Sequence, residues 1–342
     1  MKIRSTPLLA LGAVSLLALA GCATPAAEVE TVGNGNDDQQ NLTLAVFNGW
    51  DEGVAVSELW KAILDEKGYN VELEYADVAP VYEGLASGDY DLTMDIWLPD
   101  THGEYLETYG DDITDLGAWN NESKLTIAVN ADAPIDSLAE LAENADLFGN
   151  QIVGIEAGAG LTAATEDRVI PSYGLEGMDF TTSSTAAMLT ELKAATDAGE
   201  NDVVTLWEPH WAYGTFPIKN LEDPEGTLES VESLHSFGST DFSAKFPEAS
   251  GWIESFEMDL ETLYTLEEAM FVDYDGSDYA PIVAQWIEDN RSTWTRSRAS
   301  SPHLQWKPAS VDAGFRVSPT VPGAGRARSP LRAHGLLPAR PT

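Results

Sequence analysis

Two segments of the chain repeat one order of predicted elements and end in the same short string. Each segment alternates strands with helices. The strands are predicted at 42–47, 71–75 and 92–97 in the first segment, and at 151–155, 179–182 and 203–207 in the second. Each last strand closes with a tryptophan followed two residues later by a proline, in Trp97-Leu98-Pro99 and Trp207-Glu208-Pro209. This alternation predicts two α/β lobes of βαβ units, with ligand-facing loops at the carboxyl ends of the strands.

The helices between these strands carry apolar residues at helical spacing. After the first strand these residues are Val56, Leu59, Trp60 and Ile63, and Asp51 is the predicted N-cap. Further helices are predicted at 80–86, 161–170, 184–198, 256–264 and 280–290. The resulting division expects the first part of lobe one at 42–130, lobe two at 131–212, and a return to lobe one with C-terminal helices at 213–294.

The first residues have the pattern of an exported protein. A short basic start precedes an apolar run at 8–20, which is long enough for a signal-peptide core and too short to span a membrane. The run ends in Leu19-Ala20-Gly21-Cys22, which resembles the lipobox of bacterial lipoproteins. The resemblance implies that residues 1–21 are a lipoprotein signal peptide and that Cys22 carries the lipid. Residues 22–41 are small, polar and acidic, and we interpret them as a flexible tether.

A lipid on Cys22 would hold the mature protein at the cell membrane, on the extracytoplasmic face, in the periplasm or at the cell surface. Cys22 is the only cysteine of the chain, so no disulfide can form within it. No later stretch has the roughly 18 consecutive apolar residues of a membrane span. The sequence therefore predicts an anchored protein that does not cross the membrane.

Acidic residues dominate the chain until its last part. The net charge is −39, from 57 Asp and Glu against 18 Lys and Arg, and eight of these basic residues follow Trp294. Such a surface disfavours nucleic-acid binding, which needs clusters of cations. It is typical of a protein exposed to high salt, where screening weakens the repulsion between like charges.

Residues 295–342 have the opposite charge balance and are rich in Pro, Ser, Ala and Gly. They show no hydrophobic period, so we expect a disordered basic tail. The abrupt reversal favours a frameshifted or read-through segment that is not native coding sequence. A genuine basic interaction tail is the alternative.

Three tryptophans stand where predicted strands end. Trp50, Trp97 and Trp207 occupy strand ends or strand-to-helix turns, where binding residues concentrate. Indole faces attract a cation through the ring quadrupole, by about 0.5–2 kcal/mol per ring. They are the main means of holding a quaternary ammonium group, which has no N–H to donate and whose pairing with a carboxylate would require costly desolvation. Filling the core between the lobes is the alternative role of these side chains.

Three strings of the sequence resemble one family of binding proteins. The strings are Gly49-Trp50-Asp51-Glu52, Trp97-Leu98-Pro99-Asp100-Thr101-His102 and Trp207-Glu208-Pro209-His210-Trp211. In this order and with the lipobox, they are similar to the glycine betaine/proline betaine-binding lipoproteins of ABC importers, over nearly all of 42–294. The resemblance implies an α/β, two-lobed periplasmic-binding-protein fold of type II, in which each lobe is a mixed sheet flanked by helices and the ligand cleft lies between the lobes. It assigns Trp50, Trp97 and Trp207 to a prism around the trimethylammonium group.

The resemblance also assigns the carboxylate of the ligand to Gly160, Leu161 and His102. In the family this group is held by two consecutive backbone N–H groups of a glycine loop and by the histidine of the W-L-P-x-T-H string. Gly160 and Leu161 open a predicted helix, where unpaired N–H groups and the helix dipole favour an anion. His210 and Trp211 also belong to a family string, and we interpret them as structural.

The implied function is capture of glycine betaine or a related compatible solute for an ABC permease, without a cofactor or metal. The alternatives are a choline- or carnitine-binding protein of the same fold and a ligand-sensing receptor component. Glu156 and Glu208 bear on this choice, because an acid near the tryptophans would favour a plain cation such as choline over a zwitterion. An enzyme is disfavoured, since the sequence has neither a nucleophile motif nor a usable Cys/His metal spacing, and no catalytic residue is assigned.

Overall fold

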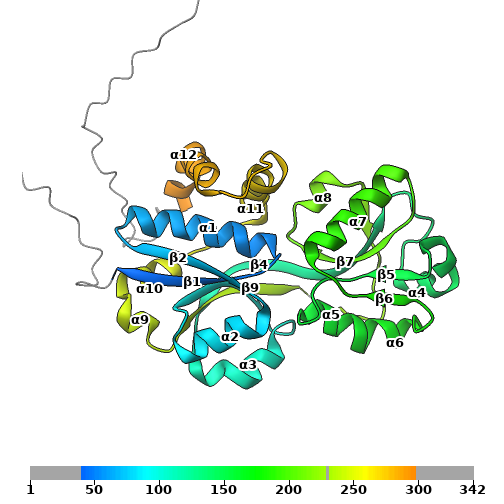
Figure 1. The fold of residues 1–342 in the computed structure, drawn as a ribbon, viewed down its shortest axis with the longest axis horizontal. Coiled ribbons are helices and arrows are strands. Elements are labelled where there is room, and N and C mark those ends of the chain that lie inside the picture. Colours follow the sequence, from blue (N-terminus) through cyan, green and yellow to red (C-terminus); the bar gives the residue numbers. More distant parts are fainter. Residues whose placement is uncertain (1–39, 229–230, 298–342) are drawn as a thin grey trace, which may run out of the picture. The chain divides into compact units, whose positions relative to one another are not determined.

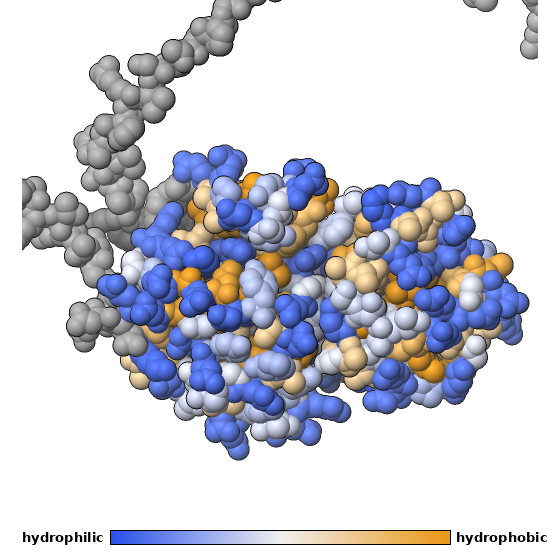
Figure 2. Space-filling model, in the orientation of Figure 1, coloured by the Kyte–Doolittle hydropathy of each residue, from blue (hydrophilic) through white to orange (hydrophobic). Residues whose placement is uncertain are grey.

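The computed structural model describes residues 40–228 and 231–297. The predicted signal peptide, Cys22, the tether up to residue 39 and the basic tail from residue 298 lie outside these residues. Among the described residues, none of the helices combines the length and the apolar character that a membrane crossing requires. Figure 2 shows a face on which hydrophilic residues predominate and apolar ones form small, scattered patches.

Lobe one contains a mixed sheet with helices on both sides (Figure 1). Its strands are β1 (Asn41–Phe47), β2 (Asn70–Ala76), β3 (Leu92–Leu98), β9 (Glu232–Ser239) and the first part of β4 (Ile113–Asn130). Its helices are α1 (Asp51–Glu66), α2 (Val78–Ser87), α3 (Gly103–Tyr109), the 3₁₀ helix Gly110–Asp112, α9 (Phe242–Lys245), α10 (Pro247–Ile253), α11 (Leu260–Glu267), the π-helix Glu268–Val272 and α12 (Ala280–Ser297). β1 runs parallel to β2 and β3, whereas β9 is antiparallel to β3 and β4.

Lobe two has the same general construction. Its strands are β5 (Gln151–Val153), β6 (Asp179–Thr181), β7 (Val203–Glu208), β8 (Ile218–Asn220) and the last part of β4. Its helices are α4 (Leu138–Leu141), the 3₁₀ helix Ala142–Phe148, α5 (Gly160–Ala164), the π-helix Thr165–Val169, α6 (Ile170–Tyr173), α7 (Thr185–Ala198) and α8 (Ala212–Thr215). β5 is parallel to β6 and β7, and β4 is antiparallel to β7 and β8.

The long strand β4 belongs to the sheets of both lobes. Its first part pairs with β9, and its residues from Lys124 to Val129 pair with β7. Within the described residues the strand order is therefore continuous, β2-β1-β3-β9-β4-β7-β5-β6, with β8 beside β4. The sequence analysis assigned no strand to β4 or β9. The register of β4 against β9 shifts repeatedly, and Gly117 has a φ of +110°, so this part lacks a regular alternation. The predicted lobe boundaries stay predictions.

Most predicted elements are confirmed within a few residues, and two predictions need correction. Asp51 is not the N-cap of α1; that position belongs to Trp50, and Asp51 is the first helical residue. The helix predicted at 256–264 begins only at Leu260, because the side chain of Asp259 accepts a hydrogen bond from the Thr262 N–H and caps it there. The helix predicted at 161–170 is confirmed, and it contains a π-helical turn.

Helix α1 packs closely on strand β3 through a glycine. Its apolar stripe is buried, with Val56, Leu59 and Trp60 at most 1% exposed. At Gly53 an added Cβ would lie 2.3 Å from Oδ2 of Asp95 and 2.8 Å from its Cβ and Cγ. A methyl group at this position would therefore collide with the body of a buried side chain.

Gly53→Ala tests this packing. In a helix, alanine is favoured over glycine by roughly 1 kcal/mol, but overpacking costs about 1–3 kcal/mol. We expect Gly53→Ala to lower the free energy of unfolding, measured by urea denaturation. Gly251 in α10 is exposed, with nothing within 4 Å of an added Cβ, so Gly251→Ala should be neutral or stabilising. Equal effects of the two substitutions would contradict the described packing.

Candidate functional site

The six residues selected from the sequence line one cavity, formed where the lobes meet. Lobe one provides Trp50, Trp97 and His102. Lobe two provides Gly160, Leu161 and Trp207, and the remaining lining residues are Glu52, Thr101, Leu125, Ile155 and Ala159. The cavity has a volume of about 20 Å³, which is room for about one water molecule. The structure thus has the two lobes close together around this point.

The three tryptophans approach the cavity from different elements. Trp50 precedes α1, Trp97 lies near the end of β3, and Trp207 near the end of β7. All three are at most 5% exposed. The indole N–H of Trp97 donates to Oδ1 of Asp95 in its own strand at 3.0 Å, whereas that of Trp207 donates across the lobes to Oε2 of Glu52 at 2.8 Å. These bonds fix the rings and leave their faces for other contacts.

His102 provides a hydrogen-bond donor at the cavity wall. Its ring stacks on Trp50, with centroids 5.3 Å apart and planes at 18°. Its Nδ1 accepts the Trp97 backbone N–H at 3.1 Å, so the ring proton is on Nε2. Burial lowers the pKa of His102 to about 3, which keeps the imidazole neutral. Nε2 is buried and has no hydrogen-bond partner among the described residues.

Gly160 and Leu161 open the helical run that starts with α5. The N–H groups of a first helical turn have no partner within the helix, and the dipole there favours negative charge. Gly160 also lies against lobe one, since an added Cβ would be 2.1 Å from the carbonyl oxygen of Thr101. Only a glycine fits at this contact. Nearby, the Tyr105 hydroxyl of lobe one donates to the Gly158 carbonyl of lobe two at 3.1 Å.

Glu232 of β9 holds the loop that carries Thr101. One carboxylate oxygen accepts the backbone N–H groups of Asp100 and Thr101, at 3.0 and 2.9 Å, and the other accepts the Thr101 hydroxyl. The loop between Trp97 and His102 is therefore fixed from the neighbouring strand. This support comes from a residue 131 positions after Thr101, which the sequence did not indicate.

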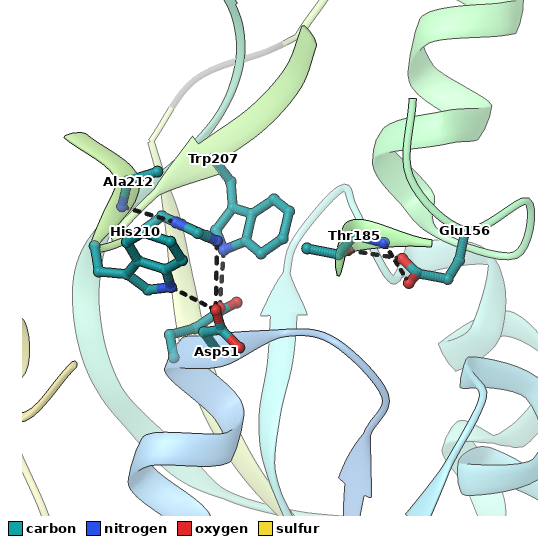
Figure 3. Close-up of polar contacts among 8 residues, drawn as sticks. Asp51, Glu156, Thr185, Trp207, His210 and Ala212 are labelled. Carbon is teal, nitrogen blue, oxygen red and sulfur yellow. Dashed lines mark hydrogen bonds and ion pairs between the residues drawn. The ribbon is translucent and has the colours of Figure 1, made fainter. Parts of the chain in front are cut away.

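The two acids that the sequence analysis placed near the tryptophans do not line the cavity. Glu156 accepts hydrogen bonds from the N–H and hydroxyl of Thr185 at the start of α7 (Figure 3). Glu208 pairs with Lys124 at 3.1 Å and accepts a hydrogen bond from Asn220. Both carboxylates are thus engaged elsewhere, and neither supports a preference for a plain cation.

The first turn of α1 contacts the end of β7 through a second indole. Figure 3 shows Asp51 facing His210 beside Trp207. The indole N–H of Trp211 donates to Oδ2 of Asp51 at 2.5 Å. His210 packs edge-on against Trp207, and its Nδ1 accepts the Ala212 N–H. His210 and Trp211 are absent from the cavity lining, as their structural interpretation expects.

Sequence reasoning missed two buried acids behind the tryptophans, Glu52 and Asp95. Both are at most 2% exposed. Burial, together with the charges of Asp95 and Glu267, raises the pKa of Glu52 well above its usual range, and burial raises that of Asp95 to about 7. The sequence did indicate that each acid is buried. Glu52 precedes Val56 by one helical turn on the apolar face of the helix, and Asp95 interrupts an apolar strand.

The raised pKa of Asp95 predicts how stability depends on pH. The folded protein keeps this proton up to about pH 7, whereas the unfolded chain loses it near pH 4. The burial of Asp95 therefore destabilises the fold progressively as pH rises from about 4 to 7. We expect Asp95→Asn to gain stability relative to the natural protein over that range, measured by urea denaturation at several pH values. Exposed Glu66→Gln is the control, and a gap that stays constant with pH would contradict the prediction.

Comparison with known proteins identifies relatives of this fold. Residues 40–289 match the family described as the substrate binding domain of the ABC-type glycine betaine transport system, OpuAC. The glycine betaine/carnitine transport binding protein GbuC of Listeria monocytogenes is 32% identical over 160 residues, which is 46% of this chain and 51% of that protein. The match thus spans about half the length of this curated relative.

Two solved structures are similar over most of the described residues. Lactococcal OpuAC, closed and complexed with glycine betaine, has a TM-score of 0.69 and 26% identity, covering 75% of this chain and 99% of that one. The glycine/betaine/L-proline-binding protein ProX of Borrelia burgdorferi has a TM-score of 0.69 and 28% identity, covering 74% and 94%. These matches confirm the resemblance first drawn from three strings, and the type II fold. The chain therefore belongs to the OpuAC family, the substrate binding domains of ABC-type glycine betaine transport systems.

Proposed function

We propose that the protein captures glycine betaine in the cavity between its lobes and presents it to an ABC permease. The main support for this proposal is that six residues from two lobes line one cavity. Indole faces are present for a quaternary ammonium group, and unpaired N–H donors are present for a carboxylate. Family membership supports the same solute class.

The three tryptophans, here called the Trp cage, suit a cation that has no N–H to donate. Each indole face contributes about 0.5–2 kcal/mol, more when water is excluded. All three side chains are nearly fully buried, so a bound onium group would be desolvated with them. The ring of Trp97 is held at its N–H edge by Asp95 of the same strand, which pre-organises that face before the ligand arrives.

The opposite wall suits an anion. The Nε2–H of His102 is buried and unpaired among the described residues, and leaving a buried donor unpaired costs roughly 1–3 kcal/mol. A ligand carboxylate would satisfy it, together with the N–H groups of Gly160 and Leu161. This favours a zwitterion such as glycine betaine over choline, which lacks the carboxylate. Carnitine also carries both groups.

The protein would act at the membrane, together with a permease. A lipid on Cys22 would tether the protein to the extracytoplasmic face of the membrane, close to the permease, and binding rather than catalysis would be its whole activity. Ligand would select the closed arrangement of the lobes, which the permease would recognise. Such a protein would serve osmoprotection, and a ligand-sensing receptor component would use the same site.

Calorimetric titration of the purified protein with glycine betaine and with choline tests the function. His102→Phe keeps a ring beside Trp50 but removes the N–H donor. We expect it to weaken glycine betaine binding by roughly tenfold or more and choline binding by less than about threefold. His235→Ala, outside the cavity, is the control. If the natural protein binds no onium compound, the proposed function is wrong; equal losses for both ligands would instead refute the role of His102.

Gly160→Ala tests the requirement for close approach of the lobes. The added methyl group would meet the Thr101 carbonyl and keep the lobes apart. We expect glycine betaine affinity to fall by roughly tenfold or more, with little change in the melting temperature of the unliganded protein. Gly158→Ala is the matched control, because its Cβ would be 3.8 Å from the nearest atom, the Tyr105 hydroxyl. Unchanged affinity in Gly160→Ala would rule out this contact as part of the binding-competent state.

A further inference from the structure

Glu52 joins the cavity wall of lobe one to a cage tryptophan of lobe two. It lies in the first turn of α1, is 1% exposed and lines the cavity. Its Oε2 accepts the indole N–H of Trp207 at 2.8 Å. Trp97 is held within its own strand by Asp95, and the Trp50 N–H has no hydrogen-bond partner among the described residues. Of the three cage indoles, only that of Trp207 depends on the other lobe for its N–H partner.

We propose that Glu52 is a positioning residue that sets the ring of Trp207 when the lobes close, so that the Trp cage is completed only in the closed state. The inference rests on the proposed function. In the open state the Trp207 N–H would face water, and the ring would be free to change rotamer. On closure its N–H meets a carboxyl group that already forms part of the opposite wall, and this bond fixes the orientation of the third ring.

A second hydrogen bond between the lobes lies beside the one from Trp207 to Glu52. Asp51, adjacent to Glu52, accepts the indole N–H of Trp211. Two consecutive acids at the start of α1 therefore accept hydrogen bonds from two indole N–H groups, one at the end of β7 and one in the residues after it. Trp207 belongs to the Trp cage and Trp211 does not. Glu52 therefore couples closure of the lobes to the ligand site, whereas Asp51 only holds the two lobes together.

The acceptor oxygen of Glu52, rather than its charge, carries the positioning. Burial, together with the charges of Asp95 of β3 and Glu267 of α11, raises the pKa of Glu52, and a neutral carboxyl still offers a carbonyl oxygen to the indole. Glutamine places an equivalent oxygen at the same reach. Aspartate is shorter by one methylene group and would not meet the indole at 2.8 Å. This contrast separates positioning from a general need for an acid.

The test is calorimetric titration of glycine betaine into the purified full chain and its variants. We expect Glu52→Ala to weaken binding roughly ten- to a hundredfold and Glu52→Gln to stay within about threefold of the natural protein. Trp207→Phe keeps a ring but lacks the N–H, so adding Glu52→Ala to it should cost less than about threefold further. Glu66→Ala, exposed on the same helix, is the control.

Lobe closure gives a readout that a merely structural role would not move. Small-angle X-ray scattering should show compaction on ligand addition for the natural protein and Glu52→Gln, and reduced compaction for Glu52→Ala. Should Glu52→Ala fail to fold, Glu52→Gln and Glu52→Asp decide, with glutamine retaining affinity and aspartate losing about tenfold. The inference is overturned if Glu52→Ala binds like the natural protein, if glutamine is as weak as alanine, or if the double variant shows additive losses. A natural protein that binds no onium compound would instead refute the proposed function.

Discussion

The junction between the start of α1 and the end of β7 is the interaction on which the site depends. Two acids from one lobe accept hydrogen bonds from two indole N–H groups of the other, and the Glu52–Trp207 pair is nearly fully buried. Hydrogen bonds of this kind are worth most where the dielectric constant is low, and they cost most when left unmade. Glu52 and Trp207 also line the cavity, so this junction helps to set the relative positions of its walls.

The charges around the cavity follow from burial. The surface of the protein is strongly acidic, yet the acids behind the indoles hold their protons more tightly than exposed ones, and His102 stays neutral for the same reason. Burial therefore disfavours full charge on the groups that line the cavity, and the wall consists largely of ring faces and dipoles. Such a wall suits a ligand whose own two charges cancel. It is also little affected by screening from external salt, which acts mainly on exposed groups.

Much of this arrangement follows from local patterns in the sequence. The strand ends at Trp97 and Trp207 are marked by apolar runs stopped by prolines, and the turn at Gly160 by its glycines. The family resemblance added the roles of Gly160, Leu161 and His102, so six lining residues could be named before any coordinates. Glu52, Glu232 and the strand β4 could not be placed in the same way. Their partners lie far away in the chain, and the helical spacing that indicates burial of Glu52 does not indicate which indole it contacts. The acids noted from the sequence were Glu156, which precedes the glycine loop, and Glu208, which follows Trp207, but they are turned toward Thr185 and Lys124.

Strand β4 also bears on how the two halves can move. It is hydrogen-bonded to β9 along its first part and to β7 along its last, so one continuous strand is common to both sheets. Sliding one half past the other would break those ladders, whereas twisting the strand between them would not. We therefore expect the two lobes to open by a hinge rotation about β4. Residues of the two lobes that lie far from β4 would then move apart by a large distance, whereas residues beside β4 would hardly separate.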